Sequence, residues 1–209
     1  MARKYGGPIS ERRKARMREV ISRRQLDLVV VIEDLADPHN TAAVFRSAEA
    51  FGVGELHLVT DRAAWPGVNP AVSAHTHRWV DQRRWFDPLP CARELLGRGL
   101  TLLTTALDDD SVDYRDVDWT RPTAVVFGQE KKGVSRGMRE QADASVMVPM
   151  VGFAQSLNVS VSAGVVLSEA LRQRRAAGLT EPRWDDARQA LFERWIAREE
   201  DGPPHPVTA

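Results

Sequence analysis

Short runs of apolar and β-branched residues alternate along this chain with stretches in which apolar residues recur at helical spacing. The apolar runs predict strands at residues 28–32, 55–60, 100–105, 123–128 and 145–148. The helical stretches lie between them, at residues 41–51, 90–97 and 135–142. This alternation predicts an α/β domain with a mostly parallel sheet and helices on both faces.

Residues 148–171 combine a predicted loop with a helix that is apolar on nearly every side. Other parts of the protein must therefore cover most of that helix, which begins at Val159. Its entrance is polar, because Gln155, Ser156 and Asn158 gather where unpaired backbone amides favour a polar or anionic ligand. The pattern fits both a capped core helix and a ligand loop that leads into a buried helix.

The formal net charge of the 209 residues is zero, but the charge is unevenly distributed. Residues 1–24 contain nine Lys or Arg and two Glu, a net charge of +7 that the rest of the chain balances with −7. We expect a basic helix over residues 10–24 and a second basic patch near residue 174, both suited to attracting RNA phosphates. A solvated amphipathic helix explains the N-terminal charge equally well. The candidate RNA-binding residues are Arg12, Arg13, Arg16, Arg24, Arg172, Arg174 and Arg175.

The chain divides into three predicted parts. They are a basic arm at residues 1–24, one domain at 25–178, and a C-terminal helix and tail at 179–209. Asp185 is well placed to cap the last helix, which we expect to pack on the domain. The apolar stripe of that helix comprises Ala187, Leu191 and Trp195. Residues 202–209 are expected to be disordered.

Several classes of site and location are excluded by composition. The single cysteine, Cys91, excludes an internal disulfide and a multi-cysteine zinc site, and we predict a structural role for it. His75 and His77 have no further ligands at metal-site spacing, so we expect no metal. The apolar runs are too short to span a bilayer, and no apolar signal region follows the basic N-terminus. We therefore expect a cytoplasmic protein that does not bind a membrane.

The first strand–helix unit contains two candidate functional residues. Asn40 follows a helix-breaking turn and is expected to cap the helix. Arg46 lies on that helix among Ala42, Ala43 and Ala50, so its guanidinium has a clear approach to a ligand. The common alternative is a surface arginine that lies over small side chains.

The turn after the strand at 123–128 contains Gly128 and Gly133 on either side of Glu130. Two glycines permit a tight turn and a close backbone approach to a ligand, and Glu130 can accept hydrogen bonds from it. The turn lacks the GK[ST] ending of a Walker loop and the GxGxxG fingerprint of dinucleotide-binding folds. Alone, it does not identify the ligand.

Taken together, three segments resemble the motifs of the SpoU (TrmH) branch of the SPOUT RNA 2′-O-methyltransferases. The segments are Pro38-His39-Asn40 with Arg46 and Gly52, FGQEKKG at residues 127–133, and VPM at 148–150 running to QSLNVS at 155–160. Their order and spacing are highly specific, and the similarity covers residues 12–180. The chain departs from the family at Asp37, His75-Thr76 and Phe153-Ala154, and it keeps every motif residue.

The resemblance implies an α/β fold whose C-terminal portion is threaded through a deep trefoil knot, an exception to the rule against knots. It also implies S-adenosylmethionine as methyl donor, held by loops of the three C-terminal segments. The cofactor-binding residues that the resemblance implies are Thr105, Gly128, Val148, Met150, Ser156, Leu157 and Asn158.

The resemblance further implies that a ribose 2′-oxygen of RNA attacks the methyl group with the help of Arg46. Because a guanidinium is an extremely weak acid, two versions stay open: Arg46 accepts the proton, or it stays charged and stabilises the developing alkoxide. Asn40 would position the ribose or Arg46, and Glu130 would brace the loop or the donor. Ser156 and Asn158 complete the implied catalytic set.

The members that this chain resembles most act on guanosine 18 of the tRNA D-loop, and family members form homodimers. We therefore expect tRNA as a partner and a homodimer that buries part of the helix beginning at Val159, with each active site drawing residues from both chains. One alternative is the same reaction on ribosomal RNA or at another tRNA position. A second alternative is a non-catalytic RNA-binding module.

Overall fold

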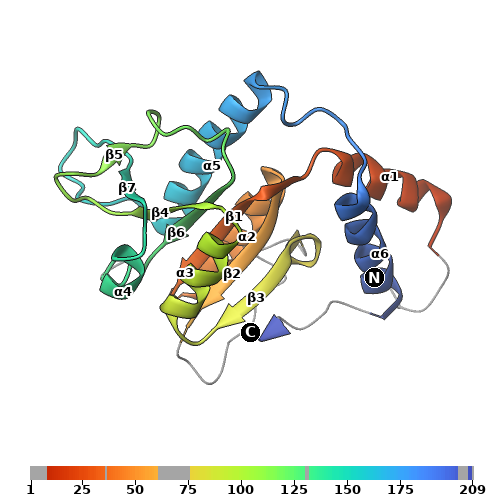
Figure 1. Cartoon of the computed structure of the whole chain (residues 1–209), viewed down its shortest axis with the longest axis horizontal. Coiled ribbons are helices and arrows are strands. Elements are labelled where there is room, and N and C mark those ends of the chain that lie inside the picture. Colours follow the sequence, from red (N-terminus) through yellow and green to blue (C-terminus); the bar gives the residue numbers. More distant parts are fainter. Residues whose placement is uncertain (1–8, 36, 61–75, 130–131, 202–206, 209) are drawn as a thin grey trace.

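The computed structural model describes residues 9–35, 37–60, 76–129, 132–201 and 207–208, which form a parallel β-sheet flanked by helices (Figure 1). The strands are β1 Gln25–Glu33, β2 Val53–Val59, β3 Asp81–Trp85, β4 Thr101–Thr105, β5 Val112–Asp113, β6 Thr123–Phe127, β7 Ala144–Met147 and β8 Val207–Thr208. Their order in the sheet is β5-β7-β4-β6-β1-β2-β3-β8, and each of these pairings is parallel. The predicted α/β class is confirmed.

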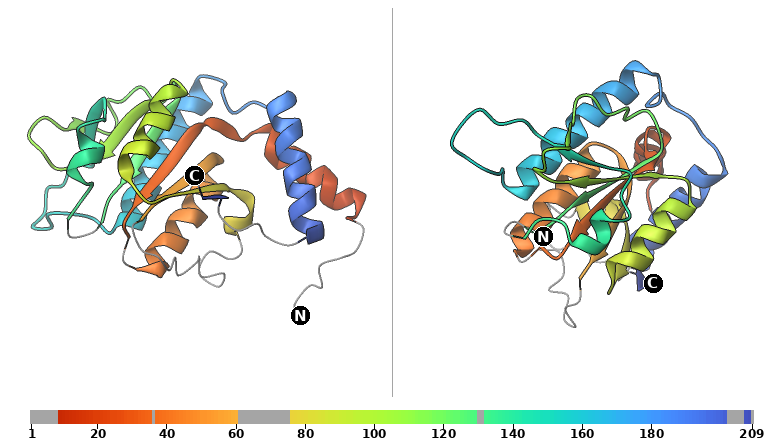
Figure 2. Two further views of the ribbon diagram at one scale, coloured as in Figure 1. Left: turned by 60° about the horizontal axis from the view of Figure 1, so that its bottom comes forward. Right: turned by 60° about the vertical axis from the view of Figure 1, so that its left-hand side comes forward.

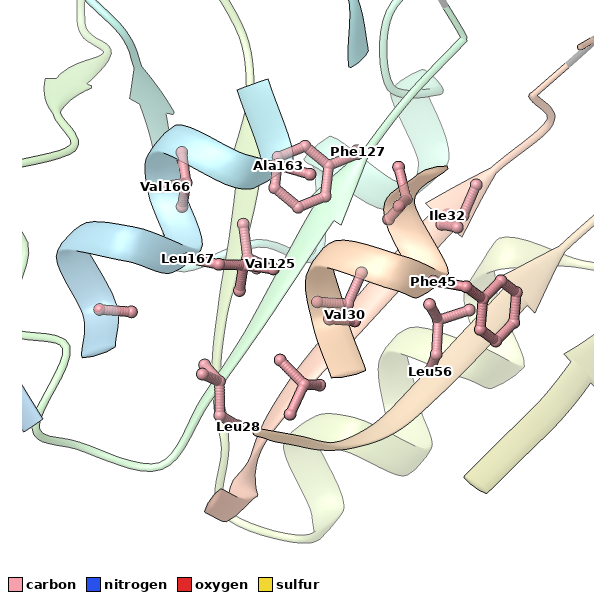
Figure 3. Close-up of a cluster of buried hydrophobic side chains, with 14 of the residues drawn as sticks. Leu28, Val30, Ile32, Phe45, Leu56, Val125, Phe127, Ala163, Val166 and Leu167 are labelled. Carbon is pink, nitrogen blue, oxygen red and sulfur yellow. The ribbon is translucent and has the colours of Figure 1, made fainter. Parts of the chain in front are cut away.

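Helices cover both faces of the sheet. The helices of the described residues are α1 Glu11–Ser22, α2 Pro38–Ala50, the 3-10 helix η1 Thr76–Trp79, α3 Pro88–Gly97, α4 Arg136–Arg139, α5 Val159–Ala176 and α6 Asp186–Asp201, of which α2, α3, α4 and α5 pack on the sheet. Successive side chains of a strand point to opposite faces, so Leu28, Val30 and Ile32 of β1 share a core with α2 and α5 (Figure 3). Val29 and Val31 share the other core with α3 and α4.

The terminal helices α1 and α6 pack against each other beside the sheet (Figures 1 and 2). Met17 and Ile21 of α1 form a small core with Leu191, Phe192 and Trp195 of α6. The predicted basic helix and the predicted packing of the last helix are therefore both present. The two helices form a unit whose core is separate from the two cores of the sheet.

The C-terminal predictions need two corrections. Asp185 accepts a hydrogen bond from the Arg188 backbone N–H at 2.9 Å, as the predicted cap requires. Ala187, however, is exposed, and the buried Arg188 lies on the packed face. Residues 207–208 were expected to be disordered, but they form β8 and pair with β3. The rest of segment 202–209 lies outside the described residues.

Two elements of the sheet domain also differ from the sequence prediction. Strand β3, with the sequence DQRRW, has too few apolar residues to be found by hydrophobicity, and its neighbour β2 supplies Glu55 as an ionic partner for Arg83. The helix predicted at residues 135–142 is a single turn, α4, after which the chain leads into β7. Cys91 has the predicted structural position: it is buried in α3, and this burial raises the pKa of its thiol.

Candidate active site

The three motif segments meet at the carboxyl edge of the parallel sheet. β1 and β6 are neighbours in register, with Ile32 opposite Phe127, so the loops that follow them begin side by side. β4 lies next to β6, and β7 lies on the other side of β4, with Thr105 opposite Val146. The carboxyl edge is where open α/β sheets bind ligands, because the loops there are free of the strand ladder.

A cavity of about 500 Å³ opens at this edge. Six of the seven predicted cofactor-binding residues line it: Thr105, Gly128, Val148, Met150, Ser156 and Leu157. The seventh, Asn158, is the N-cap of α5 and directly precedes the lining residue Val159. A cavity of this size and mixed lining is suited to a ligand as large as a nucleoside derivative.

The segment after β6 is held tightly by its own backbone. Gln129 and Gly133 exchange backbone hydrogen bonds of 3.1 and 2.7 Å, and Gly133 has a φ of +69°. A Cβ on Gly128 would lie 2.2 Å from the Gly133 carbonyl carbon, so glycine is required there by the protein's own chain. The sequence interpretation had assigned this close approach to a ligand. Glu130 lies outside the described residues.

A direct hydrogen bond joins the first and third motifs. The Asn158 amide nitrogen donates to the Asn40 side-chain oxygen at 3.1 Å, and the Asn158 oxygen accepts from the Ser160 backbone N–H at 2.9 Å. The prediction that Asn40 caps its helix is wrong. Helix α2 begins before Asn40, at Pro38, and Asp37 is its N-cap. Asn40 is instead used to fix the start of α5 relative to α2.

Arg46 is exposed on α2, and its guanidinium makes no hydrogen bond or ion pair with a described residue. Arg46 lies six positions after Asn40, and about 3.6 residues make a helical turn, so the two side chains leave α2 in different directions. Arg46 is not among the residues that line the cavity. Within one chain, the structure therefore brings Asn40 and Asn158 together but leaves Arg46 apart from the cavity.

Two of the predicted RNA-binding residues are buried. The Arg24 guanidinium pairs with Glu49 at 2.9 Å, and the Arg174 guanidinium pairs with Asp27 at 2.7 Å; each arginine is only 1% exposed. The prediction that Arg24 and Arg174 meet RNA is wrong, because both guanidinium groups are enclosed inside the protein. Burial lowers the pKa of Arg24, and the Glu49 carboxylate opposes that shift.

The other predicted arginines lie at the surface to different degrees. Arg12, Arg16, Arg172 and Arg175 are exposed, and Arg172 and Arg16 form ion pairs on their own helices. Arg13 is only partly accessible: it contacts Glu199 at 3.2 Å, and its guanidinium lies over the Trp79 ring, 5.1 Å from the ring centre. Its observed contacts hold α1 against α6 and η1.

Several classes of site are missing from the part of the chain that the structure describes. No group of His, Cys, Asp and Glu side chains there is arranged to hold a metal ion. The Gln82 side chain donates to the His77 carbonyl oxygen at 2.9 Å, and His75 lies outside the described residues. No helix there is long and apolar enough to cross a membrane.

The profile of the SpoU rRNA Methylase family matches residues 27–168. The chain belongs to the SpoU rRNA Methylase family. A relative from Thermus thermophilus named tRNA (guanosine(18)-2′-O)-methyltransferase is 44% identical over 191 residues, which span 90% of this chain and 98% of the relative.

Solved structures of SpoU proteins resemble the fold. The A. aeolicus TrmH/SpoU tRNA modifying enzyme superposes with a TM-score of 0.85 at 36% identity, covering 90% of this chain and 97% of that one. The SpoU methyltransferase AviRb from Streptomyces viridochromogenes, solved in complex with the cofactor AdoMet, gives a TM-score of 0.64 at 29% identity, covering 71% and 60%.

Sequence reasoning missed part of the cavity wall of this SpoU-family chain. Asp108 and Arg139 line the cavity and form an ion pair of 3.2 Å, and Gln129 and Lys132 line it as well. Asp108 belongs to a run of three aspartates, a composition typical of a solvated loop. Its position three residues after β4, at the carboxyl edge of the sheet, was the signal for a place in the site.

Proposed function

We propose that this chain is an enzyme that transfers the methyl group of S-adenosylmethionine to the ribose 2′-hydroxyl of guanosine 18 in tRNA. The observation that carries the proposal is that the three SpoU motifs meet at one sheet edge, where the second and third motifs line a cavity and the Asn40–Asn158 hydrogen bond joins the first motif to the third. The Thermus relative has this activity in its name and is similar over nearly its whole length.

The cavity residues fit S-adenosylmethionine. Val148, Met150 and Leu157 offer apolar surface for an adenine ring, and polar groups lie beside them. The Gln129 side-chain oxygen is buried and has no hydrogen-bond partner among the described residues, so a donor from a bound molecule would satisfy it. Thr105 is held in place, since its hydroxyl donates to the Val126 carbonyl oxygen at 3.0 Å.

When bound, S-adenosylmethionine supplies an electrophilic methyl group on a positively charged sulfur. The chain must then align a ribose 2′-oxygen and manage its proton. Asn40 and Asn158 fix the approach of α2 to the start of α5, and Ser156 borders the cavity beside them. Arg46, with its guanidinium in solvent, meets the RNA and either accepts the proton or stabilises the developing negative oxygen. We assign to Glu130 the role that the family resemblance implies, which is to brace either the loop after β6 or the methyl donor.

We propose a homodimer in which each active site receives Arg46 from the partner subunit. Two observations support it. Arg46 is exposed and is absent from the lining of its own chain's cavity. Gly164, in the middle of α5, has no heavy atom within 4 Å of the place where a Cβ would lie, so nothing in its own chain requires glycine there. A glycine inside a helix costs about 1 kcal/mol relative to alanine, and a closely packed second α5 would account for it.

We further infer that the C-terminal portion is threaded into the deep trefoil knot that the family resemblance implies, and the superposition on the A. aeolicus enzyme supports this. The separate core of α1 and α6 supports a division into an arm at 1–24, a methyltransferase domain at 25–178 and a C-terminal segment at 179–209. We place the protein in the cytoplasm with its tRNA substrate.

Transfer of a labelled methyl group to unmodified tRNA transcripts tests the proposal, with ribosomal RNA fragments assayed in parallel because the family profile is named for that substrate. We expect label in tRNA alone, and Arg46→Ala to lower transfer at least about a hundredfold, as expected for loss of a group that acts in the transition state. Calorimetry should show unchanged affinity of Arg46→Ala for S-adenosylmethionine. A wild-type chain that binds tRNA but not S-adenosylmethionine would instead establish a non-catalytic RNA-binding module.

The variant Arg46→Lys separates charge from shape. Lysine keeps the positive charge but loses the planar fork of hydrogen-bond donors. If Arg46→Lys is as inactive as Arg46→Ala, the fork is what the reaction needs. Near-normal transfer by Arg46→Lys would show that a positive charge near the ribose is sufficient.

A further inference from the structure

Glu33 is a buried carboxylate at the carboxyl end of β1, close to the candidate active site but not among the residues that line its cavity. Its side chain is 6% exposed. Its Oε2 atom accepts a hydrogen bond of 2.8 Å from the backbone N–H of Ser135, a residue 102 positions later in the chain. A carboxylate that leaves water needs such a partner, because an unpaired buried charge is strongly unfavourable.

The location of this bond relates it to the second motif. Ile32 lies opposite Phe127 in the sheet, so Glu33 lies level with Gly128, where the segment after β6 begins. Ser135 is where that segment ends, since it is the N-cap of α4. Glu33 therefore ties the end of segment 128–135 back to the sheet edge from which the segment starts.

The same segment forms one wall of the cavity. Gly128, Gln129, Lys132, Gly133 and Val134 all line it. The backbone bonds between Gln129 and Gly133 close the segment on itself, but they do not attach it to β1. Among the hydrogen bonds between described residues, the one from the Ser135 backbone N–H to Glu33 makes that attachment.

We propose that Glu33 is a positioning residue for the methyl donor: it holds segment 128–135 in the place that shapes the cavity. This proposal rests on the proposed function, because it takes the cavity to be the site of S-adenosylmethionine. Glu33 itself does not touch the cofactor. Its effect passes through the Ser135 N–H to the backbone of the second motif.

A set of four variants tests the attachment. Glu33→Ala removes the acceptor, whereas Glu33→Gln keeps an oxygen that can accept the same bond. Ser135→Pro removes the donor at a residue whose φ of −59° already suits proline. Ser135→Ala is the matched control, because it loses the hydroxyl that caps Met138 but keeps the N–H.

Affinity for S-adenosylmethionine, measured by calorimetry, is the first readout. Loss of one buried charge-assisted hydrogen bond predicts an affinity about tenfold weaker for Glu33→Ala and for Ser135→Pro. The double variant that combines Glu33→Ala with Ser135→Pro should bind S-adenosylmethionine no more weakly than either single variant. The affinities of Glu33→Gln and Ser135→Ala should stay within about threefold of wild type. The KM for the donor should rise in Glu33→Ala while kcat at saturating donor changes less. Additive effects, or an unchanged affinity in Glu33→Ala, would overturn the proposal.

Amide hydrogen exchange without any ligand is the second readout, and it separates this proposal from the proposed function. Glu33→Ala should speed exchange across residues 128–139 and leave the α1–α6 pair unchanged. If the wild-type chain does not bind S-adenosylmethionine, the proposed function fails, but faster exchange in this segment still supports the attachment. Unchanged exchange there would contradict it even in an active enzyme.

Discussion

Arg24 is a buried cation that joins α1, α2 and α6. Its guanidinium donates to the Glu49 carboxylate at 2.9 Å and to the Glu49 and Val53 carbonyl oxygens at 3.2 Å each. It also lies 5.3 Å from the centre of the Trp195 ring. Arg16, eight positions earlier, is exposed and pairs with Glu19 on its own helix. The two arginines are therefore expected to have different roles: Arg24 in the stability of the fold and Arg16 in RNA binding.

Replacing Arg24 should affect stability and replacing Arg16 should affect RNA binding. Arg24→Ala leaves Glu49 without its cation, and we expect the free energy of unfolding to fall by about 3 kcal/mol. Arg16→Ala should leave the free energy of unfolding unchanged and weaken tRNA binding. The slope of log affinity against log salt concentration should become shallower by about 1, as expected for the loss of one phosphate contact. Denaturant titration and binding assays at several salt concentrations measure both quantities. An Arg24→Ala protein of normal stability that loses tRNA affinity would instead support the prediction that Arg24 binds RNA.

Residue type alone did not separate these two arginines. Both lie in a basic stretch, and composition gives the charge of that stretch but not the burial of each side chain. Position on α1 was a usable clue for Arg13 and Met17, which share the side that meets α6, but it requires knowing that α6 packs there. That packing joins residues more than 160 positions apart. Arg24 lies beyond the end of α1, so helical spacing does not place its side chain.

At the scale of elements, α1 and α6 form a helix pair held by aromatic and ionic contacts. Trp195 is 2% exposed and lies 4.8 Å from Trp79 of η1, measured between ring centres. Arg194 and Arg198 of α6 both bind Asp81 at the start of β3. These contacts connect the helix pair to the sheet domain.

Trp195→Ala should loosen this helix pair and leave the methyltransferase domain folded. Removing a buried tryptophan costs about 3–5 kcal/mol, and here that loss falls on the packing of α6. We expect weaker tRNA binding with unchanged affinity for S-adenosylmethionine. Phe86, which is 51% exposed just after β3, provides the control, and Phe86→Ala should match wild type in both assays. Loss of donor affinity in Trp195→Ala would contradict the independence of the two units.

The elements that the sequence predicted well are those buried on both faces. β1 and β6 are continuous apolar runs, because helices cover both sides of the sheet at its centre. β3 was missed because it lies toward the sheet edge and pairs its arginines with acidic neighbours. The apolar stripe of α6 was predicted to include Ala187, but the buried residue is the next one, Arg188. An arginine is not counted as apolar in a hydrophobicity pattern, so its burial could not be predicted in this way.

At the scale of the whole molecule, one face of α5 remains uncovered. Val161 is 50% exposed, and it lines a surface hollow with Gly164, Val165, Phe51 and Tyr114. The opposite face of α5 is buried against the sheet domain, through Ala163, Val166 and Ala170. We expect the second subunit to pack on the uncovered, partly apolar hollow.

Val161→Asp should therefore give monomers. A carboxylate in this hollow would lose its water in the dimer without gaining a partner. Sedimentation should show a dimer for wild type and a monomer for Val161→Asp, with methyl transfer lost because Arg46 no longer reaches a partner's cavity. Phe86→Ser is the matched control, since Phe86 is 51% exposed on another part of the surface. A monomeric wild-type protein that is fully active would contradict the shared site.

The motif residues of the candidate site were predictable because family resemblance carries their order and spacing. The contacts among them were not, since the Asn40–Asn158 bond depends on the sheet placing two distant loops together. The hydrogen bond between Glu33 and Ser135 was not predictable either, because an acidic residue at a strand end does not indicate a backbone partner 102 positions away.

The central claim is tested most directly by locating the methyl group on the RNA. Unmodified tRNA transcript, incubated with the wild-type chain and isotopically labelled S-adenosylmethionine, is digested and the modified nucleotide is identified by mass spectrometry. We predict a single labelled nucleotide, 2′-O-methylguanosine at position 18, in full-length tRNA far more than in an isolated D-arm, because contacts outside the loop position the ribose. Label at the wobble ribose or in ribosomal RNA would contradict the substrate assignment, and label on a base atom would contradict the role of Arg46 at a ribose hydroxyl.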